Sequence, residues 1–245
     1  MATVRTARLL ERQPVGDGAF LRFEMSDGAP LGFRGGQYII VDTGLDLPDG
    51  KRRKRAYSLT SSDSDQGRFE LAVYPVAGGL GAATMLALEA GTQVRFSGPW
   101  GKLAPVLAES EERVWVVASD TGITAALGLL RGAGFAPALQ HTTLVWWAAS
   151  REYFLSPTEV EARCPGDLRL RHIRSPAVGT PERQTAFVGC LDALASEGPP
   201  TRVYLAGDGE LPAFARAFLD QRGLADVPIQ SENFFHHPVR KASLL

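Results

Sequence analysis

The chain has 245 residues, and its 26 lysines and arginines against 27 aspartates and glutamates give a formal net charge of −1, which excludes an overall field that would draw it to nucleic acid or to an anionic membrane. Two cysteines are too few for a disulfide framework, a four-thiolate iron–sulfur cluster or a structural zinc site, and the four histidines have no metal-ligand spacing. No apolar run approaches the ~20 residues of a membrane helix, and the first residues lack a secretory signal, so we expect a globular, cytoplasmic protein.

Residues 1–108 predict a small antiparallel β-barrel. Short runs rich in β-branched and aromatic residues alternate here with clusters of Gly, Pro and Asp, which is typical of strands joined by turns. The predicted strands include residues 19–23, 37–41, 68–74 and 93–96. Residues 97–101 read Ser-Gly-Pro-Trp-Gly and predict a tight turn at the edge of this domain.

Residues 109–245 predict a second domain with a parallel sheet covered by helices, because strand-like and helix-like segments alternate there. The predicted strands are residues 114–118, 143–148, 168–173 and 203–206, and the predicted helices follow the first strand, begin after Ser156 and cover residues 211–219. Ser156 and Glu159 form a capping box with Pro157 at the first helical position. Residues 109–113 are the predicted hinge between the domains.

Three short motifs contain residues suited to binding a nucleotide. Arg55, Tyr57 and Ser58 begin a predicted strand, where a guanidinium, a ring and a hydroxyl can hold a diphosphate and cover a flat ring. Residues 78–85 place three glycines before a helix-like stretch, whose free N–H groups can receive phosphate oxygens. Residues 120–124 follow the first strand of the parallel sheet, where such sheets bind ligands. Taken singly, Arg-x-Tyr-Ser is more often a solvated basic loop followed by an ordinary strand, and the glycines at residues 78–81 are about as often plain turns. Residues 120–124 do not match Gly-x-Gly-x-x-Gly, so their sequence alone is a weak signal.

The order of these motifs resembles the ferredoxin–NADP reductase superfamily over nearly the whole chain. Arg-x-Tyr-Ser at residues 55–58 is followed by Gly-Gly at 78–79, Gly-Pro-x-Gly at 98–101, Thr-Gly-Ile-Thr at 121–124, Leu-Ala-Gly-Asp-Gly at 205–209 and Glu-x-Phe-Phe at 232–235. Motifs in this order are far more specific than any one of them. The resemblance implies an FAD-binding barrel at residues 1–108 and an NAD(P)H-binding α/β domain at residues 109–245, which ends in a tail beside the flavin.

The resemblance also implies roles for individual residues. Ser58 and Glu232 would be catalytic. FAD would be bound by Arg55, Tyr57, Ser58, Tyr74, Val76, Gly78, Gly79, Gly81, Ala82, Thr84 and Phe235. The pyridine nucleotide would be bound by Thr121, Gly122, Thr124, Ser150, Arg151, Arg174, Gly207 and Asp208. Ser150 and Arg151 stand where NADPH-using relatives place a Ser and an Arg, which favours NADPH over NADH.

Three departures from the family pattern bear on these roles. Ala82 stands where relatives usually have a hydroxyl residue, and Ser119 and Asp120 stand where they commonly have glycine. Because a carboxylate pointing at a diphosphate would be repulsive, Asp120 would point away and either reach a ribose hydroxyl or cap the following helix, and we favour the cap. Relatives usually read Cys-Gly-Pro where residues 206–208 read Ala-Gly-Asp. The missing cysteine affects the expected rate of hydride transfer and leaves the expected reaction class unchanged.

The implied function is hydride transfer between NADPH and the flavin, with single electrons passing to or from ferredoxin or flavodoxin. Lys51, Arg52, Arg53 and Lys54 are a candidate docking patch for such acidic partners, and a solvated loop is the alternative. Two other functions remain open. The chain can be an NAD(P)H-dependent reductase of free flavin, ferric chelates or an oxygenase component, or a non-catalytic flavin-binding subunit.

Overall fold

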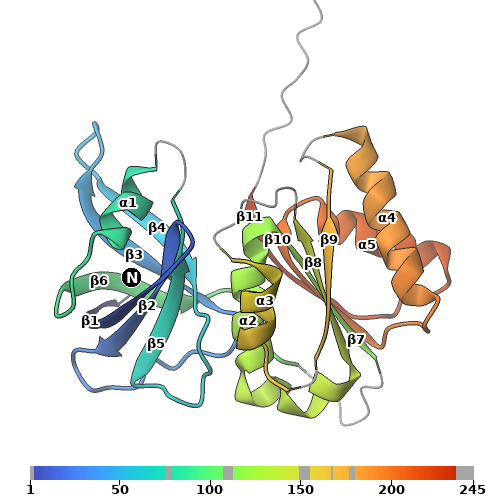
Figure 1. The fold of residues 1–245 in the computed structure, drawn as a ribbon, viewed down its shortest axis with the longest axis horizontal. Helices are drawn as coiled ribbons and strands as arrows, with labels where there is room; N and C mark the ends of the chain where they lie inside the picture. The colour runs from blue at the N-terminus through green and yellow to red at the C-terminus, as the bar shows by residue number, and fades with distance from the viewer. Residues whose placement is uncertain are drawn as a thin grey trace, which may run out of the picture.

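The computed structural model of the chain describes residues 3–75, 79–106, 113–148, 155–166, 168–176 and 180–235. These residues form two domains that lie side by side, with an antiparallel sheet in the first and a parallel sheet in the second (Figure 1). Several predicted site residues lie outside the described residues, namely Val76, Gly78, Ser150 and Arg151, together with the side chain of Phe235.

The first domain is a strongly curved antiparallel sheet. Its strands are β1 (Val4–Val15), β2 (Gly18–Met25), β3 (Tyr38–Asp46), β4 (Arg52–Ser58), β5 (Arg68–Val73) and β6 (Gln93–Trp100), in the order β4-β3-β6-β1-β2-β5. A bridge between Leu59 and Leu71 joins the chain just after β4 to β5, so the two ends of the sheet meet. Helix α1 (Leu80–Leu86) lies between β5 and β6. The predicted antiparallel, barrel-like domain is confirmed.

Aromatic side chains fill the interior of this domain. Phe23 stacks on Phe69 with ring centroids 5.3 Å apart, and Phe69 meets Phe96 edge to face at 5.5 Å. All three side chains are buried, because alternate residues of each strand point inward. This packed interior keeps the ends of β4 and β5, and the residues that follow them, in fixed positions.

The tight turn predicted at residues 97–101 is wrong. Strand β6 continues through this segment, since Ser97 pairs with Val4 and Ile40, and Trp100 pairs with Tyr38. Gly98 has a φ of 137°, which a residue with a side chain rarely adopts, so glycine lets the strand pass through the bend without ending.

The second domain is a five-stranded parallel sheet with helices on both faces. Its strands are β7 (Val114–Ser119), β8 (Thr142–Ala148), β9 (Arg169–Arg174), β10 (Arg202–Asp208) and β11 (Ile229–Phe235), in the order β11-β10-β7-β8-β9. The helices are η1 (Asp120–Gly122), α2 (Ile123–Arg131), η2 (Ala133–His141), α3 (Pro157–Arg163), α4 (Pro181–Ala195) and α5 (Leu211–Gln221). The predicted parallel α/β domain is confirmed.

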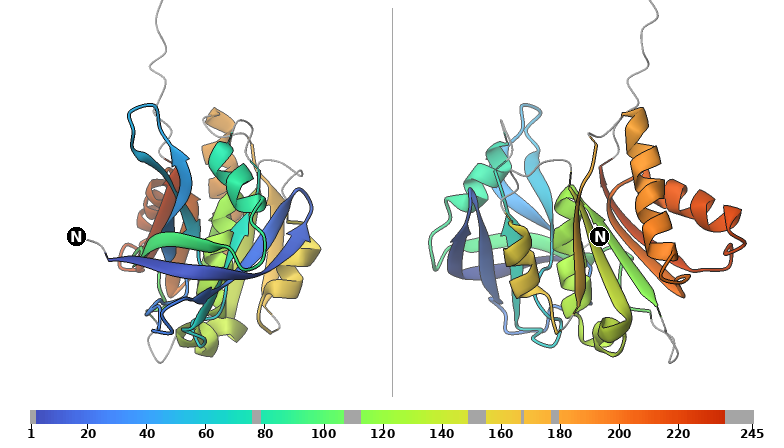
Figure 2. Two further views of the ribbon diagram at one scale, coloured as in Figure 1. Left: turned by 90° about the vertical axis from the view of Figure 1, so that its left-hand side faces the viewer. Right: turned by 45° about the vertical axis from the view of Figure 1, so that its right-hand side comes forward.

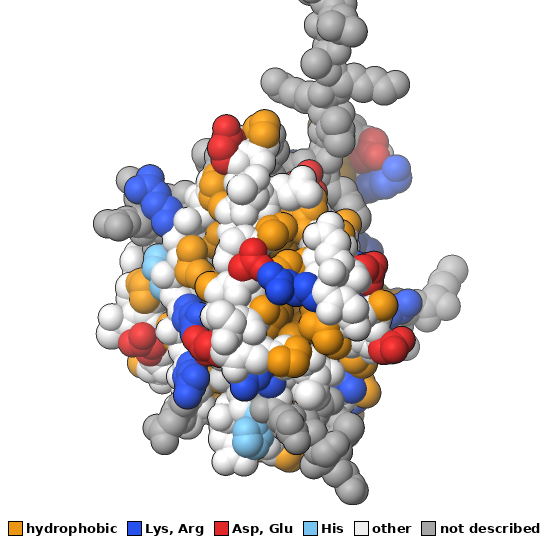
Figure 3. All heavy atoms as spheres, turned by 90° about the vertical axis from the view of Figure 1, so that its right-hand side faces the viewer, with side chains coloured by type: hydrophobic (Ala, Val, Ile, Leu, Met, Phe, Trp, Pro, Cys, Tyr) orange, Lys and Arg blue, Asp and Glu red, His pale blue; other side chains and the backbone are white. Residues whose placement is uncertain are grey.

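The two faces of the parallel sheet have separate cores. Val114 and Val116 of β7 pack with α2 on the face toward the barrel, whereas Trp115 and Val117 pack with α4 and α5 on the other face. Figures 1 and 2 show α2 and α3 between the sheet and the first domain. The α4–α5 side carries acidic and basic side chains interspersed among apolar ones, so this face has no field of a single sign (Figure 3).

Within the described ranges, no single helix is long and apolar enough to span a membrane. The segments Asp120–Arg131 and Ala133–His141 reach that length and composition together, but they are bent by 102° at the break between them. Residues 123–130 of α2 are buried in the core of the second domain, which accounts for their apolar character.

Three glycines allow the two domains to meet closely. A Cβ atom on Gly128 of α2 would lie 2.0 Å from the carbonyl oxygen of Leu59, and one on Gly35 would lie 2.4 Å from the carbonyl oxygen of Gly128. A Cβ atom on Gly132 would lie 3.2 Å from the Cα atom of Gly35. The backbones of the two domains therefore pack directly against each other here. A side chain at any of these three positions would prevent so close a contact.

Polar contacts hold the same interface. The carboxylate of Asp63 accepts from the N–H groups of Gly35, at 2.9 Å, and Ala133, at 2.7 Å. Arg131 donates to the carbonyl of Thr60 at 2.9 Å and pairs with Glu70 at 3.3 Å. These contacts hold the first domain against the C-terminal end of α2.

Candidate functional site

A pocket of about 390 Å³ opens where the two domains meet. Its size falls within the range of roughly 300–1,000 Å³ that is usual for small-molecule sites. The first domain contributes Arg55, Ala56, Tyr57, Ser58, Ala72, Tyr74, Gly79 and Ala82, and the second contributes Thr121, Thr124 and Phe234. Motifs that are distant in the sequence therefore line one cavity.

The two motifs of the first domain meet at Arg55 and Gly81. A Cβ atom on Gly81 would lie 3.0 Å from Cγ and 3.5 Å from Nε of Arg55, so the arginine side chain crosses directly over this glycine. Arg55 is exposed, and its Nη1 donates to the carbonyl of Lys54 at 2.9 Å. The absence of a side chain at Gly81 leaves room for the charged side chain of Arg55 at the edge of the pocket.

The aromatic walls of the pocket remain uncharged at physiological pH. Burial raises the pKa of Tyr57 to about 12, although the nearby charge of Arg55 opposes this shift. Burial also raises the pKa of Tyr74, and the negative charge of Asp120 adds to the effect. Both phenols therefore keep their proton and can donate a hydrogen bond. Phe234 of β11 adds a third ring.

Hydroxyl groups from both domains complete the pocket. Ser58 is buried at the end of β4 and lines the cavity. On the opposite wall, the hydroxyl of Thr124 donates to the carbonyl of Thr121 at 2.9 Å. Gly122 lies behind them, because a Cβ atom there would come within 2.1 Å of the carbonyl oxygen of Ala206. Glycine is therefore needed at this position for η1 to pack against β10.

Glu232, predicted to be catalytic, lies at the domain junction and outside the described pocket lining. The N–H of Lys102 donates to its Oε2 at 3.3 Å, just beyond the end of β6. Burial raises the pKa of Glu232, and the backbone N–H groups of Lys102 and Leu103 oppose the shift. The carboxyl group thus binds the segment that leaves the barrel.

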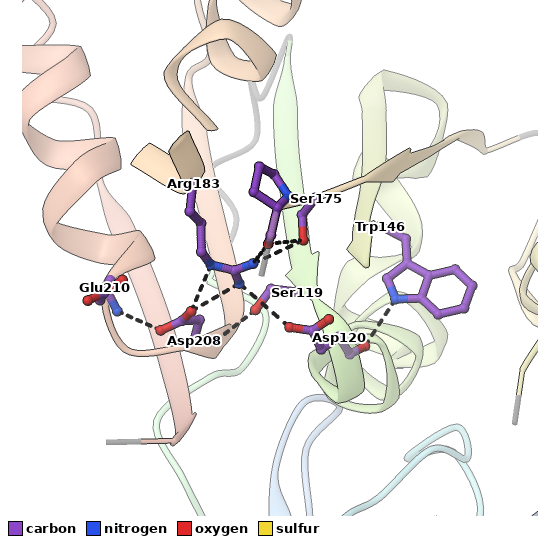
Figure 4. A network of polar contacts seen from close by, with 8 residues as sticks. Ser119, Asp120, Trp146, Ser175, Arg183, Asp208 and Glu210 are labelled. Atoms are coloured by element: carbon purple, nitrogen blue, oxygen red, sulfur yellow. Dashed lines mark hydrogen bonds and ion pairs between the residues drawn. The ribbon is translucent and has the colours of Figure 1, made fainter. Parts of the chain in front are cut away.

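The predicted role of Asp120 as a helix cap is wrong. Its side chain caps neither η1 nor α2, and its φ of 49° places it in the left-handed region. Its Oδ2 atom lies 3.5 Å from Nη2 of Arg183, a residue of the first turn of α4 (Figure 4). A buried guanidinium attracts the carboxylate more strongly than a helix N-terminus does, which explains why the cap is not formed.

Gly207 and Asp208 were predicted to bind the nucleotide, but in the structure they contact other residues of the chain. Asp208 accepts from Nε of Arg183 at 3.1 Å and from the N–H of Glu210 at 3.1 Å, and its own N–H donates to Ser119 Oγ at 2.8 Å. A Cβ atom on Gly207 would lie 2.3 Å from that same Oγ atom. These residues pack the end of β10 against the end of β7 and do not line the pocket.

Arg183 is the main residue of this region that the sequence did not point to. Its side chain is 1% exposed and lies over the ring of Trp147, 4.5 Å from the ring centre. Its Nη1 donates to Ser175 Oγ at 3.0 Å and to the carbonyl of Pro176 at 2.8 Å. Thr180 followed by Pro181 is a signal for the start of a helix, and it would have placed Arg183 in the first helical turn. No local sequence pattern predicts which residues Arg183 contacts.

Several other predicted residues lie away from the pocket. The Thr84 hydroxyl donates to the carbonyl of Leu80 at 2.9 Å, and its side chain lines a separate surface pocket beside Asp42 and Arg52. Arg174 is exposed at the end of β9. On β11, the aromatic side chain that lines the pocket is Phe234, one position before the Phe235 that we predicted.

The basic run at residues 51–54 lies beside acidic partners. Lys51 pairs with Asp49 at 2.9 Å, and Arg52 pairs with Asp46 at 3.0 Å and with Asp42 at 3.7 Å. Three carboxylates therefore offset part of the positive charge of residues 51–54. The attraction of this segment for an acidic partner is weaker than its four cationic residues alone would give.

Comparison with known proteins agrees with this arrangement. Residues 7–104 match the family of oxidoreductase FAD-binding domains. The chain is 34% identical over 152 residues to ferredoxin–NADP reductase B of Sorangium cellulosum, covering 62% of this chain and 61% of that protein. It is also 34% identical over 114 residues to the ferredoxin–NAD(+) reductase component of the alkene monooxygenase system of Xanthobacter autotrophicus, covering 46% of this chain and 33% of that protein.

The fold is that of known reductase structures. The cytochrome b5 reductase domain of Ulva prolifera nitrate reductase superposes with a TM-score of 0.68 at 20% identity, over 95% of this chain and 97% of that domain. The chain spans less than two thirds of the length of the curated relatives it matches. The motif order, the match of residues 7–104 to the FAD-binding domain family and the fold agree with one another, and the chain is similar to reductases of the ferredoxin–NADP reductase type.

Proposed function

We propose that the chain is an FAD-containing oxidoreductase that passes hydride between NADPH and the flavin, and single electrons to or from ferredoxin or flavodoxin. The observation that carries this proposal is the pocket at the domain junction, where the strand end with Arg55, Tyr57 and Ser58 faces Thr121 and Thr124 of the second domain. The names of two of the curated relatives, both of them ferredoxin reductases, support it.

The residues of the first domain fit a flavin nucleotide. FAD would supply the two-electron chemistry, while the protein binds and orients it. The cationic arm of Arg55 would pair with the diphosphate, since guanidinium binds phosphate through two parallel hydrogen bonds. The neutral phenol of Tyr57 would cover the ring and donate a hydrogen bond. Ser58 would hydrogen-bond the ring edge, and the small residues Gly79 and Ala82 would let the cofactor approach the backbone.

The second domain would hold the pyridine nucleotide at the carboxyl end of its parallel sheet. Thr121 and Thr124 would contact its nicotinamide side, because they line the wall of the pocket opposite Ser58. Arg174 is exposed at the same end of the sheet, where a guanidinium can meet the 2′-phosphate that distinguishes NADPH from NADH. With Ser150 and Arg151, it supports NADPH as the donor.

An anaerobic reduction experiment tests this function. The protein is reconstituted with FAD, its absorbance is recorded, and NADPH and NADH are added separately. We expect both nucleotides to bleach the flavin absorbance, NADPH faster. Arg174→Ala should narrow the difference between the nucleotides, whereas Arg169→Ala, at the opposite end of β9, should leave it unchanged. Failure of both nucleotides to reduce bound FAD would contradict the proposal and favour a non-catalytic flavin-binding subunit.

A second acceptor class is favoured by one observation. The basic run at residues 51–54 is offset by Asp42, Asp46 and Asp49, which weakens its attraction for an acidic protein. This supports an NAD(P)H-dependent reductase of free flavin, ferric chelates or an oxygenase component. Competition decides between the two: ferredoxin or flavodoxin should outcompete a small-molecule acceptor at low protein concentration, with a rate that falls as salt rises. If the small-molecule acceptor is reduced faster at every salt concentration, the protein belongs to the second class of reductase.

A further inference from the structure

The side chain of Arg53 on β4 contains a buried donor that lacks a partner. Its Nε atom is buried and makes no hydrogen bond with the described residues, and none of them forms an ion pair with its guanidinium. A buried N–H group without a partner costs free energy, and such groups are few in folded proteins. A ligand that pairs with the guanidinium would account for this one.

The carboxylates nearest in sequence pair with other residues. Asp42, Asp46 and Asp49 form their ion pairs with Lys51 and Arg52. These two basic side chains are exposed, whereas the one that follows them at position 53 is partly buried. The positive charge at this position therefore stays uncompensated although it is the less exposed one.

Arg53 lies on the same face of β4 as Arg55. Side chains alternate along a strand, so residues two apart share a face and are about 6–7 Å from each other. The hydroxyl of Thr43 donates to the carbonyl of Arg53 at 2.9 Å. A Cβ atom on Gly81 would lie 3.4 Å from Cγ2 of Thr43 and 3.0 Å from Cγ of Arg55. The start of α1 therefore lies over the place where these residues of β3 and β4 meet.

The pocket at the domain junction has less positive charge than a diphosphate requires. Arg55 is the one charged residue of its described lining, whereas the diphosphate of FAD carries two negative charges. Charges removed from water need a partner of opposite sign or hydrogen bonds. Gly79 and Ala82 have no side-chain donor to offer, and the hydroxyl of Thr84 already donates to the carbonyl of Leu80. A second cation beside Arg55 would balance the charge.

We propose that Arg53 is a second diphosphate-binding residue of the FAD site, which pairs with the cofactor together with Arg55. The inference rests on the proposed function. Two arginine side chains on one face of a strand are long enough to reach the same diphosphate, and guanidinium binds phosphate through two parallel hydrogen bonds. The cofactor then supplies the partner that the chain itself does not give to Arg53.

The substitution Arg53→Met separates this role from a purely structural one. Methionine keeps a long apolar side chain and removes the guanidinium. Because an unpaired buried donor is lost, the Tm of the flavin-free variant should equal or exceed that of the wild type. Arg95→Met is the matched control, since Arg95 is an exposed arginine on the outer face of the same domain. A clearly lower Tm for Arg53→Met than for Arg95→Met would mean that the guanidinium stabilises the chain itself, and would overturn the inference.

The probe is FAD, whose binding to the flavin-free protein is followed by fluorescence quenching at low and high salt. We expect Arg53→Met to raise the Kd at least about tenfold at low ionic strength, because a charge-assisted hydrogen bond is lost. The difference from the wild type should shrink in roughly 1 M salt, because ions screen the attraction between guanidinium and phosphate. Arg95→Met should bind FAD like the wild type at both salt concentrations.

The possible outcomes separate this inference from the proposed function. If Arg55→Met weakens FAD binding and Arg53→Met does not, the inference fails and the FAD site stands. An equal loss in Arg95→Met, or a loss in Arg53→Met that salt does not change, would also overturn the inference alone. If the wild type binds FAD with the expected effect of Arg53→Met, but neither NADPH nor NADH reduces the flavin, the proposed function fails and the inference stands. If the wild type binds no FAD, both fail.

Discussion

Arg183 at the start of α4 donates from Nε to Oδ2 of Asp208 at the end of β10, at 3.1 Å, and both side chains are buried. Removing the guanidinium would take this cation away from the buried carboxylate of Asp208 and from Asp120. We therefore expect Arg183→Leu to lower the free energy of unfolding by about 3–5 kcal/mol. Urea denaturation followed by circular dichroism measures this change.

The control for this prediction is an exposed ion pair on the same layer of helices. Arg222, which directly follows α5, pairs with Asp192 of α4, and both side chains are nearly half exposed. Arg222→Leu should change the free energy of unfolding by no more than about 1 kcal/mol, because water screens the pair. Similar losses in the two variants would show that burial of the Arg183 cluster does not have the energetic effect described.

A substitution that adds a single methyl group tests the close contact between the domains. Gly128→Ala would place a Cβ atom 2.0 Å from the carbonyl oxygen of Leu59, so α2 must shift away from the barrel. We expect a loss of about 1–3 kcal/mol in the free energy of unfolding, the usual range for overpacking. The matched change Gly189→Ala in α4 has open space around it and should stabilise the protein by roughly 0.5–1 kcal/mol. Equal effects of both changes would contradict the described interface.

The pH dependence of stability should include a contribution from Glu232. Burial raises the pKa of its carboxyl group in the folded protein, so the folded state binds this proton more tightly than the unfolded state does. Its favourable contribution is present below the ordinary glutamate pKa and is lost as the pH rises through the higher pKa of the folded state. Glu232→Gln should remove this decline from urea unfolding measured between about pH 4 and 7.

An exposed glutamate gives the comparison for Glu232. Glu89 lies at the surface between α1 and β6, and Glu89→Gln makes the same change of charge there. This variant should keep the wild-type pH profile. If Glu232→Gln also keeps it, the carboxyl group of Glu232 does not have the raised pKa assigned to it.

The two cysteine thiols should be unreactive in the folded protein. Burial raises the pKa of both Cys164 and Cys190 to about 11, so at pH 8 roughly one molecule in a thousand carries either thiolate. A chromogenic disulfide reagent should react slowly under native conditions and should titrate two thiols in denaturant. Fast native reaction of either thiol would mean that its side chain is more accessible than described.

Local signals in the sequence predicted much of the fold. The capping box of Ser156 and Glu159 begins α3 as expected, and the apolar spacing at residues 211–219 corresponds to α5. Helix α4 was not predicted, although it buries Phe187, Cys190, Leu191 and Leu194 along one side. Strand β6 contradicted its Gly-Pro signal, because pairing with β1 and β3 determines its path.

The candidate site was predictable in part. The order of motifs pointed to Arg55, Tyr57, Ser58, Thr121 and Thr124, which do line one pocket. The choice between Phe234 and Phe235 depends on which residue of β11 faces that pocket, and two adjacent phenylalanines give no local signal for it. Arg183, Asp120 and Asp208 lie on separate segments, so their association depends on how α4 packs against the sheet.

Equilibrium binding of FAD to the flavin-free protein tests the account most directly. We expect the wild type to bind one FAD per chain, with quenching of tyrosine and tryptophan fluorescence. Arg55→Ala combined with Ser58→Ala should raise the Kd by at least about tenfold, because the pair loses a charge-assisted hydrogen bond and a neutral one. Arg95→Ala, on the outer face of the barrel, should bind FAD like the wild type. Unchanged affinity in the double variant, or no FAD binding by the wild type, would contradict the assignment of this pocket to the flavin.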